Sequence, residues 1–178
     1  MIPPNALQQI KEPATPLAGP YGHPFHPIAV TLPIGAWTAS LLFDVASRRS
    51  AEPRVFARGS AALVKTGLLG AAGAAFLGFL DYTKIPAKTA THATATAHLA
   101  LNVTTMGLYA LNLAARERRL DRAATRDEPV AANEIGLSLL ALGLLGASGY
   151  LGGMLAYHYG VRVADEATQR MGLATGTA

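Results

Sequence analysis

The segment Ile135–Leu155, with the sequence IGLSLLALGLLGASGYLGGML, decides the fold class of this chain. It contains no Asp, Glu, Lys or Arg, and a helix built from it would be apolar or small on every face. A helix at the surface of a soluble protein instead shows a polar face opposite its apolar stripe. The length of the segment also matches the roughly 20 apolar residues that cross a bilayer. We therefore interpret it as a transmembrane helix.

Three further segments have the same character. Only 15% of the 178 residues are charged, and 51% are apolar. No charged residue lies between Glu12 and Asp44 or within residues 89–115, and Lys65 alone interrupts residues 60–80. The sequence therefore predicts an all-α integral membrane four-helix bundle rather than a soluble bundle of long apolar helices. Its transmembrane helices are expected at about 28–47, 61–81, 95–115 and 135–157.

These helices are expected to form one membrane domain over residues 23–163. A proline-rich tail at 1–22 precedes the domain, and a polar tail at 164–178 follows it. The first tail has no basic region followed by an apolar core, so a cleaved signal peptide is not expected.

The predicted loops differ in their arginine content. Loops 48–60 and 116–134 hold most of the arginines: Arg48, Arg49, Arg54, Arg58, Arg116, Arg118, Arg119, Arg122 and Arg126. Short loops rich in Lys and Arg stay cytoplasmic. We therefore expect both loops inside a bacterial plasma (inner) membrane and both termini outside. The net charge of +4 then reflects topology, and no nucleic-acid partner is expected.

This topology gathers every histidine on the outer side, namely His23, His26, His92, His98 and His158. Cysteine is absent, which excludes thiolate-bound iron–sulfur clusters, c-type haem and disulfides. Histidine, methionine, carboxylate and tyrosine side chains remain as groups that could hold a metal or a redox cofactor.

Two halves of the chain resemble each other. GLLGAAG at 67–73 and GLLGASG at 143–149 differ at one position. His26 and His98 are each followed nine residues later by glycine and eleven residues later by an aromatic ring. A duplicated helical hairpin would explain both matches, although Leu, Gly and Ala also recur by chance in membrane helices. Small residues four apart would in either case allow close helix packing.

The third predicted helix carries a polar stripe. Five polar residues alternate four and three apart and so share one face: His98, Asn102, Thr105, Tyr109 and Asn112. Polar groups are costly in hydrocarbon, which predicts that this face turns into the bundle. His98 lies near the outer boundary, and it is our first choice for a ligand.

Other candidate ligands lie near the outer ends of the remaining helices. Met154 and His158 stand four apart on the fourth helix, with Tyr150 one turn earlier. The expected outer cluster consists of His98, His158, His26 and Asp81. Of the first two histidines, His26 is better placed than His23 to face the bundle, because the prolines after them shape the turn into the first helix.

Asp44 lies at the opposite, inner end of the first helix. Arg48 follows it at i+4, a spacing at which side chains on a helix meet. We expect these two residues to form an ion pair at the membrane boundary.

Five stretches of the chain are similar to a known family. They are GHPFHPIAVTLPIGAW from residue 22, LLFD from 41, GLLGAAGAAFLGFLDY from 67, HLALN from 98 and GYLGGMLAYHYGV from 149. Together they resemble an uncharacterised family of bacterial four-helix inner-membrane proteins, catalogued as a domain of unknown function, over about residues 20–163. Members resemble one another at His23, His26, Pro33, Gly35, Asp44, Gly78, Asp81, His98, Asn102, Gly152 and Gly153 as numbered here.

The resemblance implies a role in membrane electron transfer, because some members are fused to or lie beside Rieske iron–sulfur or cytochrome domains. It also marks two departures. Relatives often carry His or Asp where this chain has Thr31, and some carry His where it has Met154. If either position binds a ligand in those relatives, the site here is altered, or His158 replaces it.

The leading interpretation is a b-type haem protein that transfers electrons near the outer face of the plasma membrane. His98 would be one axial ligand, and the candidates for the opposite side are His158, His26 and, more weakly, Met154. The residues that would orient a ligand imidazole or a propionate are Asn102, Tyr150 and Asp81.

Two alternatives stay open at this stage. One is a cofactor-free membrane anchor or accessory subunit of a redox complex, and the other is a histidine-rich outer site for copper, zinc or iron. An enzyme with its own substrate is less expected, because no nucleophile–base pair or phosphate loop is present. The expected partners are the bilayer and a redox protein or respiratory-complex subunit, such as a Rieske protein or a cytochrome.

Overall fold

The computed structural model describes residues 5–122 and 127–171, and every regular element in these ranges is helical. The short elements are α1 (Ala6–Gln9), the 3₁₀ turn η1 (Pro16–Ala18), α2 (His26–Ala29), the π-helical turn η2 (Met154–His158) and α7 (Glu166–Met171). The long helices are α3 (Thr31–Ser47), α4 (Pro53–Tyr82), α5 (Ala90–Arg122) and α6 (Ala132–Gly153). The prediction of an all-α chain is confirmed.

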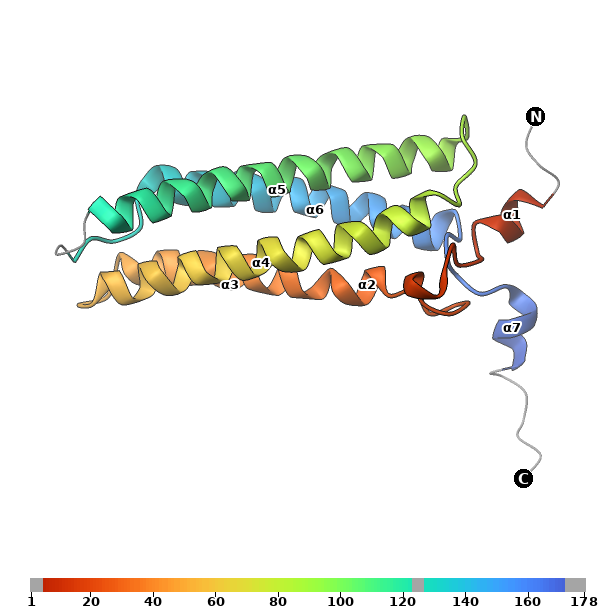
Figure 1. The fold of residues 1–178 in the computed structure, drawn as a ribbon, viewed down its shortest axis with the longest axis horizontal. Coiled ribbons are helices and arrows are strands. Elements are labelled where there is room, and N and C mark those ends of the chain that lie inside the picture. The colour runs from red at the N-terminus through yellow and green to blue at the C-terminus, as the bar shows by residue number, and fades with distance from the viewer. Residues whose placement is uncertain (1–4, 123–126, 172–178) are drawn as a thin grey trace, which may run out of the picture.

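The long helices lie side by side (Figure 1). α3 packs along α4, α5 packs along α6, and α4 and α6 also contact α5 and α3 respectively. α3 and α5 are therefore diagonal partners whose side chains meet at the centre. We call the end that holds His26, Tyr82, Ala90 and His158 the histidine end. The opposite end, with the α3–α4 and α5–α6 connections, is the arginine end.

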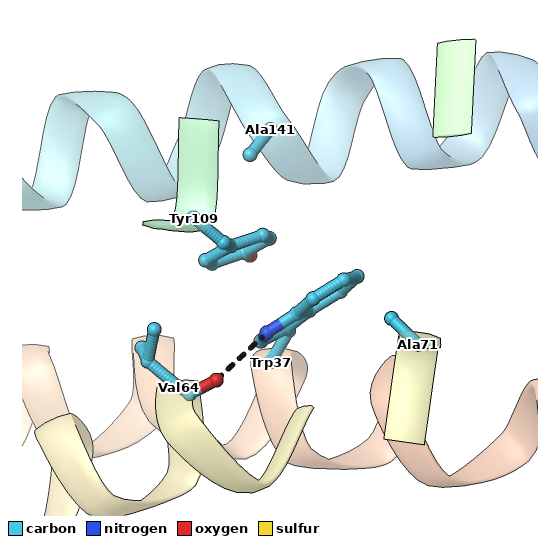
Figure 2. Packing of buried hydrophobic residues seen from close by; sticks show 5 residues of the cluster. All are labelled: Trp37, Val64, Ala71, Tyr109 and Ala141. Atoms are coloured by element: carbon cyan, nitrogen blue, oxygen red, sulfur yellow. Dashed lines mark hydrogen bonds between the residues drawn. The ribbon is translucent and has the colours of Figure 1, made fainter. Parts of the chain in front are cut away.

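Trp37 and Tyr109 meet across the centre of the bundle (Figure 2). Their rings are stacked, with centroids 4.1 Å apart and planes 10° from parallel. The indole Nε1 donates a hydrogen bond to the carbonyl of Val64 at 3.3 Å. Buried Ala71 and Ala141 belong to the same cluster. Their small side chains leave room for two large rings from diagonal helices to reach each other.

Three segments of the described chain are long and apolar enough to cross a membrane, namely His26–Ser47, Pro53–Tyr82 and Ala132–His158. α5 is not among them, although the sequence predicts a span at 95–115. The difference comes from the polar stripe of α5, which lowers its mean hydropathy. Thr105, Tyr109 and Asn112 of this stripe are buried inside the bundle.

Two helices extend well beyond the predicted segments at the arginine end. α4 begins at Pro53, and proline is favoured in a first turn because the N–H groups there have no partner within the helix. α5 continues to Arg122. Arg116, which the sequence places in a loop, therefore lies within α5, where it is buried. Arg119 and Arg122 stand in the last turn of α5, where the helix dipole favours positive charge.

Residues 5–22, expected to belong to a proline-rich tail, pack against the histidine end. Arg162 is buried there and forms an ion pair with Asp81 at 2.9 Å. Its guanidinium also donates hydrogen bonds to the carbonyls of Lys11, Ala18, Gly19 and Pro20. One side chain thus joins the N-terminal segment, the segment after η2 and the end of α4.

Candidate functional site

His26 of α2 and His98 of α5 face each other at the histidine end of the bundle. Their ring centroids are 6.3 Å apart, and the ring planes are 87° from parallel. Both side chains are half-buried. Of the four residues expected in the outer cluster, these two are brought together.

Each imidazole is held by a backbone carbonyl of the neighbouring helix. Nδ1 of His26 lies 2.8 Å from the carbonyl oxygen of Ala74, and Nδ1 of His98 lies 2.8 Å from that of Ser148. A carbonyl oxygen only accepts hydrogen bonds, so each Nδ1 carries the proton. Each Nε2 is then left with the lone pair that can bind a metal. The hydroxyl of Ser148 adds a second contact to Nδ1 of His98 at 2.9 Å.

A glycine packs against each ring. A Cβ atom at Gly78 would lie 2.8 Å from Cε1 of His26, and one at Gly152 would lie 3.2 Å from Cε1 of His98. Any larger residue at these positions would push the ring away, because close-packed interiors leave little room to adjust. The two glycines therefore fix where the imidazoles can stand.

The two Nε2 atoms differ in their surroundings. Nε2 of His98 lies 3.0 Å from the side-chain nitrogen of Asn102, which can donate a hydrogen bond to it. Nε2 of His26 has no hydrogen-bond partner within the described part of the chain. One ring nitrogen therefore presents an open lone pair, and the other shares its lone pair with an amide.

The remaining candidates lie elsewhere. His158 is exposed on η2 and contacts only the ring of Tyr159 among aromatic neighbours in the described residues. Tyr150 is 72% exposed. With Met154 and His158 it lines a shallow surface cavity of about 430 Å³. Asp81 faces Arg162 rather than a histidine.

The other two histidines do not join the pair. His92 contacts the hydroxyl of Tyr82 at 3.0 Å, and His23 is exposed. Within residues 5–122 and 127–171, no group of three or more His, Cys, Asp or Glu side chains could hold a metal ion.

A buried ion pair at the arginine end was missed by sequence reasoning. Arg116 donates to both carboxylate oxygens of Asp44, at 2.6 and 2.8 Å, and neither side chain has exposed surface. The predicted pair between Asp44 and Arg48 is wrong, because Arg48 instead donates to the carbonyl of Val130. Ser60 and Ser138 complete the hydrogen bonds around the guanidinium.

The spacing of residues could have revealed this pair. Asp44 precedes Arg116 by the same 72 residues that separate His26 from His98 and Trp37 from Tyr109. Three pairs thus meet in succession along the centre of the bundle, first histidines, then aromatic rings, then opposite charges. The sequence match between the two halves of the chain had indicated only the histidine pair and the aromatic pair as equivalent positions.

The second helix of each hairpin shows a matching spacing of 74 residues. Ala74 and Ser148 bind the two histidines through their carbonyls, and Gly78 and Gly152 pack against the same two rings. Equivalent carbonyls also receive the central rings: Trp37 donates to Val64, and the hydroxyl of Tyr109 donates to Ser138 at 3.5 Å. The structural equivalence is therefore displaced by two residues from the GLLG match, which has a spacing of 76.

Apolar helices of this length and number define a multi-pass membrane protein. The chain belongs to the family described as "Predicted membrane protein (DUF2231)", which matches residues 22–165. The resemblance to an uncharacterised membrane family is thereby confirmed. No curated protein and no solved structure matches the chain.

Proposed function

We propose that this protein is a four-span plasma-membrane protein that binds haem b between His26 and His98 and transfers electrons near the outer face of the membrane. The observation that carries the proposal is the geometry of the histidine pair, whose rings stand 6.3 Å apart with both Nδ1 atoms held by carbonyls.

The proposal takes α5 as the fourth span. Three residues of its polar stripe contact backbone carbonyls of α6, namely His98, Tyr109 and Asn112. The face that α5 turns outward between residues 100 and 111 is instead apolar or small, and consists of Ala100, Val103, Thr104, Gly107, Ala110 and Leu111. A helix with this distribution can cross a bilayer within a bundle despite its low mean hydropathy, because lipid contacts only the outward face.

The charges at the two ends support the orientation. Two arginines, Arg48 and Arg49, directly follow the end of α3, and two more, Arg118 and Arg122, lie in the last five residues of α5. All four therefore lie at the arginine end. Positive residues concentrate on the cytoplasmic side of membrane proteins, so the histidine end and both termini face outward. The matched contacts of the two hairpins further support a duplication related by an axis along the membrane normal.

The distance between the rings fits a shared iron. Two imidazoles that bind one metal at the usual nitrogen distance of about 2.0–2.1 Å have ring centres roughly 6 Å apart. The pair of His26 and His98 meets this condition. An Nδ1–H bound to a carbonyl is also the arrangement that orients a ligating histidine and raises its basicity.

The number of ligands favours haem over a free metal ion. A structural zinc or a copper site usually takes three or four protein ligands, whereas the described residues bring only two histidines together. Haem supplies four nitrogens of its own and needs at most two from the protein. Binding would require the amide of Asn102 to turn away from Nε2 of His98.

Haem b, when bound, would supply reversible one-electron oxidation and reduction. The chain contributes the rest. The carbonyls of Ala74 and Ser148 orient the two imidazoles, and the stacked rings of Trp37 and Tyr109 close the interior on the side of the arginine end.

A visible spectrum of the purified protein from a haem-replete host tests the proposal. We expect a Soret band when the protein is oxidised, and a sharpened α-band of the b type after reduction with dithionite. A colourless preparation would overturn the proposal and leave the cofactor-free anchor as the better account.

A further inference from the structure

The two halves of the histidine site differ at one pair of equivalent positions. Asn102 follows His98 by four residues, and Val30 follows His26 by four. The amide of Asn102 reaches Nε2 of His98 at 3.0 Å, whereas the apolar side chain of Val30 cannot donate to Nε2 of His26. The internal repeat thus pairs one histidine that has a neighbouring donor with one that has none.

This difference changes what happens when a histidine leaves a metal. A released imidazole keeps its lone pair, and the partial burial of these rings makes a lone pair without a donor unfavourable. His98 would find a donor at once in Asn102. His26 would find none, so its release is the more costly of the two.

We infer that His26 is the permanent ligand of the proposed haem, and that His98 is an exchangeable ligand which yields its place to a small uncharged gas molecule. This inference rests on the proposed function. The exchange breaks one coordinate bond and forms another, and it transfers no proton and no electron. The sequence had made His98 the first choice for a haem ligand, whereas this inference makes His26 the more firmly bound of the two.

A second polar group lies on the same face of α5. The hydroxyl of Thr105 is buried and has no hydrogen-bond partner within the described residues, and it stands about one turn beyond Asn102. Buried polar groups are usually paired. The amide of Asn102 is thus the hydrogen-bonding group next to His98, and the unpaired hydroxyl of Thr105 lies roughly 10 Å from His98 along the helix axis, further into the bundle.

Carbon monoxide binding to the reduced full-length protein tests the inference. We expect the wild-type protein to bind carbon monoxide, and His98→Ala to keep haem and bind the gas more tightly. His26→Gly should lose haem and regain it when imidazole is added, which shows that the variant still folds. If the two single variants behave alike, or if the wild-type haem does not bind carbon monoxide, the inference is wrong.

Asn102→Leu keeps the branched shape of the side chain and removes the donor. In the wild-type protein, the hydrogen bond from Asn102 stabilises His98 after its release from the metal. Removing one hydrogen bond of ordinary strength should weaken carbon monoxide binding roughly fivefold. Val30→Leu is the matched control and should leave the affinity unchanged. An unchanged affinity in Asn102→Leu would refute the role of the amide. Absence of haem from the wild-type protein would overturn the proposed function as well. This outcome can be told apart from the others, because each of them is observed on a wild-type protein that contains haem.

Discussion

Arg116 of α5 and Asp44 of α3 form a two-fold hydrogen-bonded ion pair with no exposed surface, and they link the two hairpins at the arginine end. Buried charges cost free energy unless they are paired and hydrogen-bonded. Here Ser60, Ser138 and Asn112 also contact the guanidinium, so its donors are well used. The pair should therefore matter for assembly of the hairpins.

Removing one partner should be more harmful than removing both. Asp44→Asn or Arg116→Met leaves a buried charge and should lower the free energy of unfolding by about 3–5 kcal/mol. The double variant Asp44→Leu/Arg116→Met should lose less than either single variant. Unfolding in mixed detergent micelles measures this, with exposed Arg118→Met as the control. A double variant as unstable as the sum of the single variants would contradict the account.

The glycines beside the histidines should not tolerate a methyl group. Gly78→Ala introduces a Cβ 2.8 Å from the ring of His26, so we expect a loss of about 1–3 kcal/mol. Gly152→Ala, with its contact at 3.2 Å, should cost less. Gly73→Ala and Gly149→Ala are controls, because no atom lies within 4 Å of the added Cβ. Thermal unfolding should leave the controls unchanged or stabilised, since alanine is the better helix former.

Trp37 offers a test of the packed centre of the bundle. It is the single tryptophan of the chain and is 1% exposed. Its fluorescence should therefore be blue-shifted and resistant to iodide. Tyr109→Ala removes the stacked ring and should increase quenching. Ready quenching of the wild-type protein would mean that the indole is exposed.

Arg162 should hold the N-terminal segment on the histidine end. Arg162→Met removes the hydrogen bonds to four carbonyls and the ion pair with Asp81. We expect faster amide hydrogen exchange over residues 8–25 in this variant. Arg170→Met is the control, because its ion pair with Glu166 is exposed and contributes little. Equal amide exchange rates in both variants would show that Arg162 does not hold the N-terminal segment in place.

The sequence was a good guide to fold class and a partial guide to helix limits. Charge-free apolar stretches predicted helices, and the structure contains them. The helix limits at the arginine end were harder to predict. A charged residue within a helix is easily taken for the end of that helix when its ion-pair partner is far away in the sequence. Arg116 is the example: its nearest acid in sequence differs from Asp44, which lies 72 residues away and across the bundle.

The candidate site was predicted only in part, again because the contacts that define it join residues far apart in the sequence. The polar stripe of α5 correctly predicted buried Thr105, Tyr109 and Asn112. Helix periodicity gives the face of one helix, but it does not give the rotation of its neighbours. The sequence therefore could not separate His26 from His158 as the neighbour of His98, and the structure brings His26 to it.

Haem content of three variants tests the central claim most directly. Wild-type protein and His158→Ala, which changes an exposed histidine at the same end, should both purify with about one haem b per chain. The double variant His26→Ala/His98→Ala should fold and carry none. Haem in the double variant, or its loss in His158→Ala alone, would contradict the assignment of the site to His26 and His98.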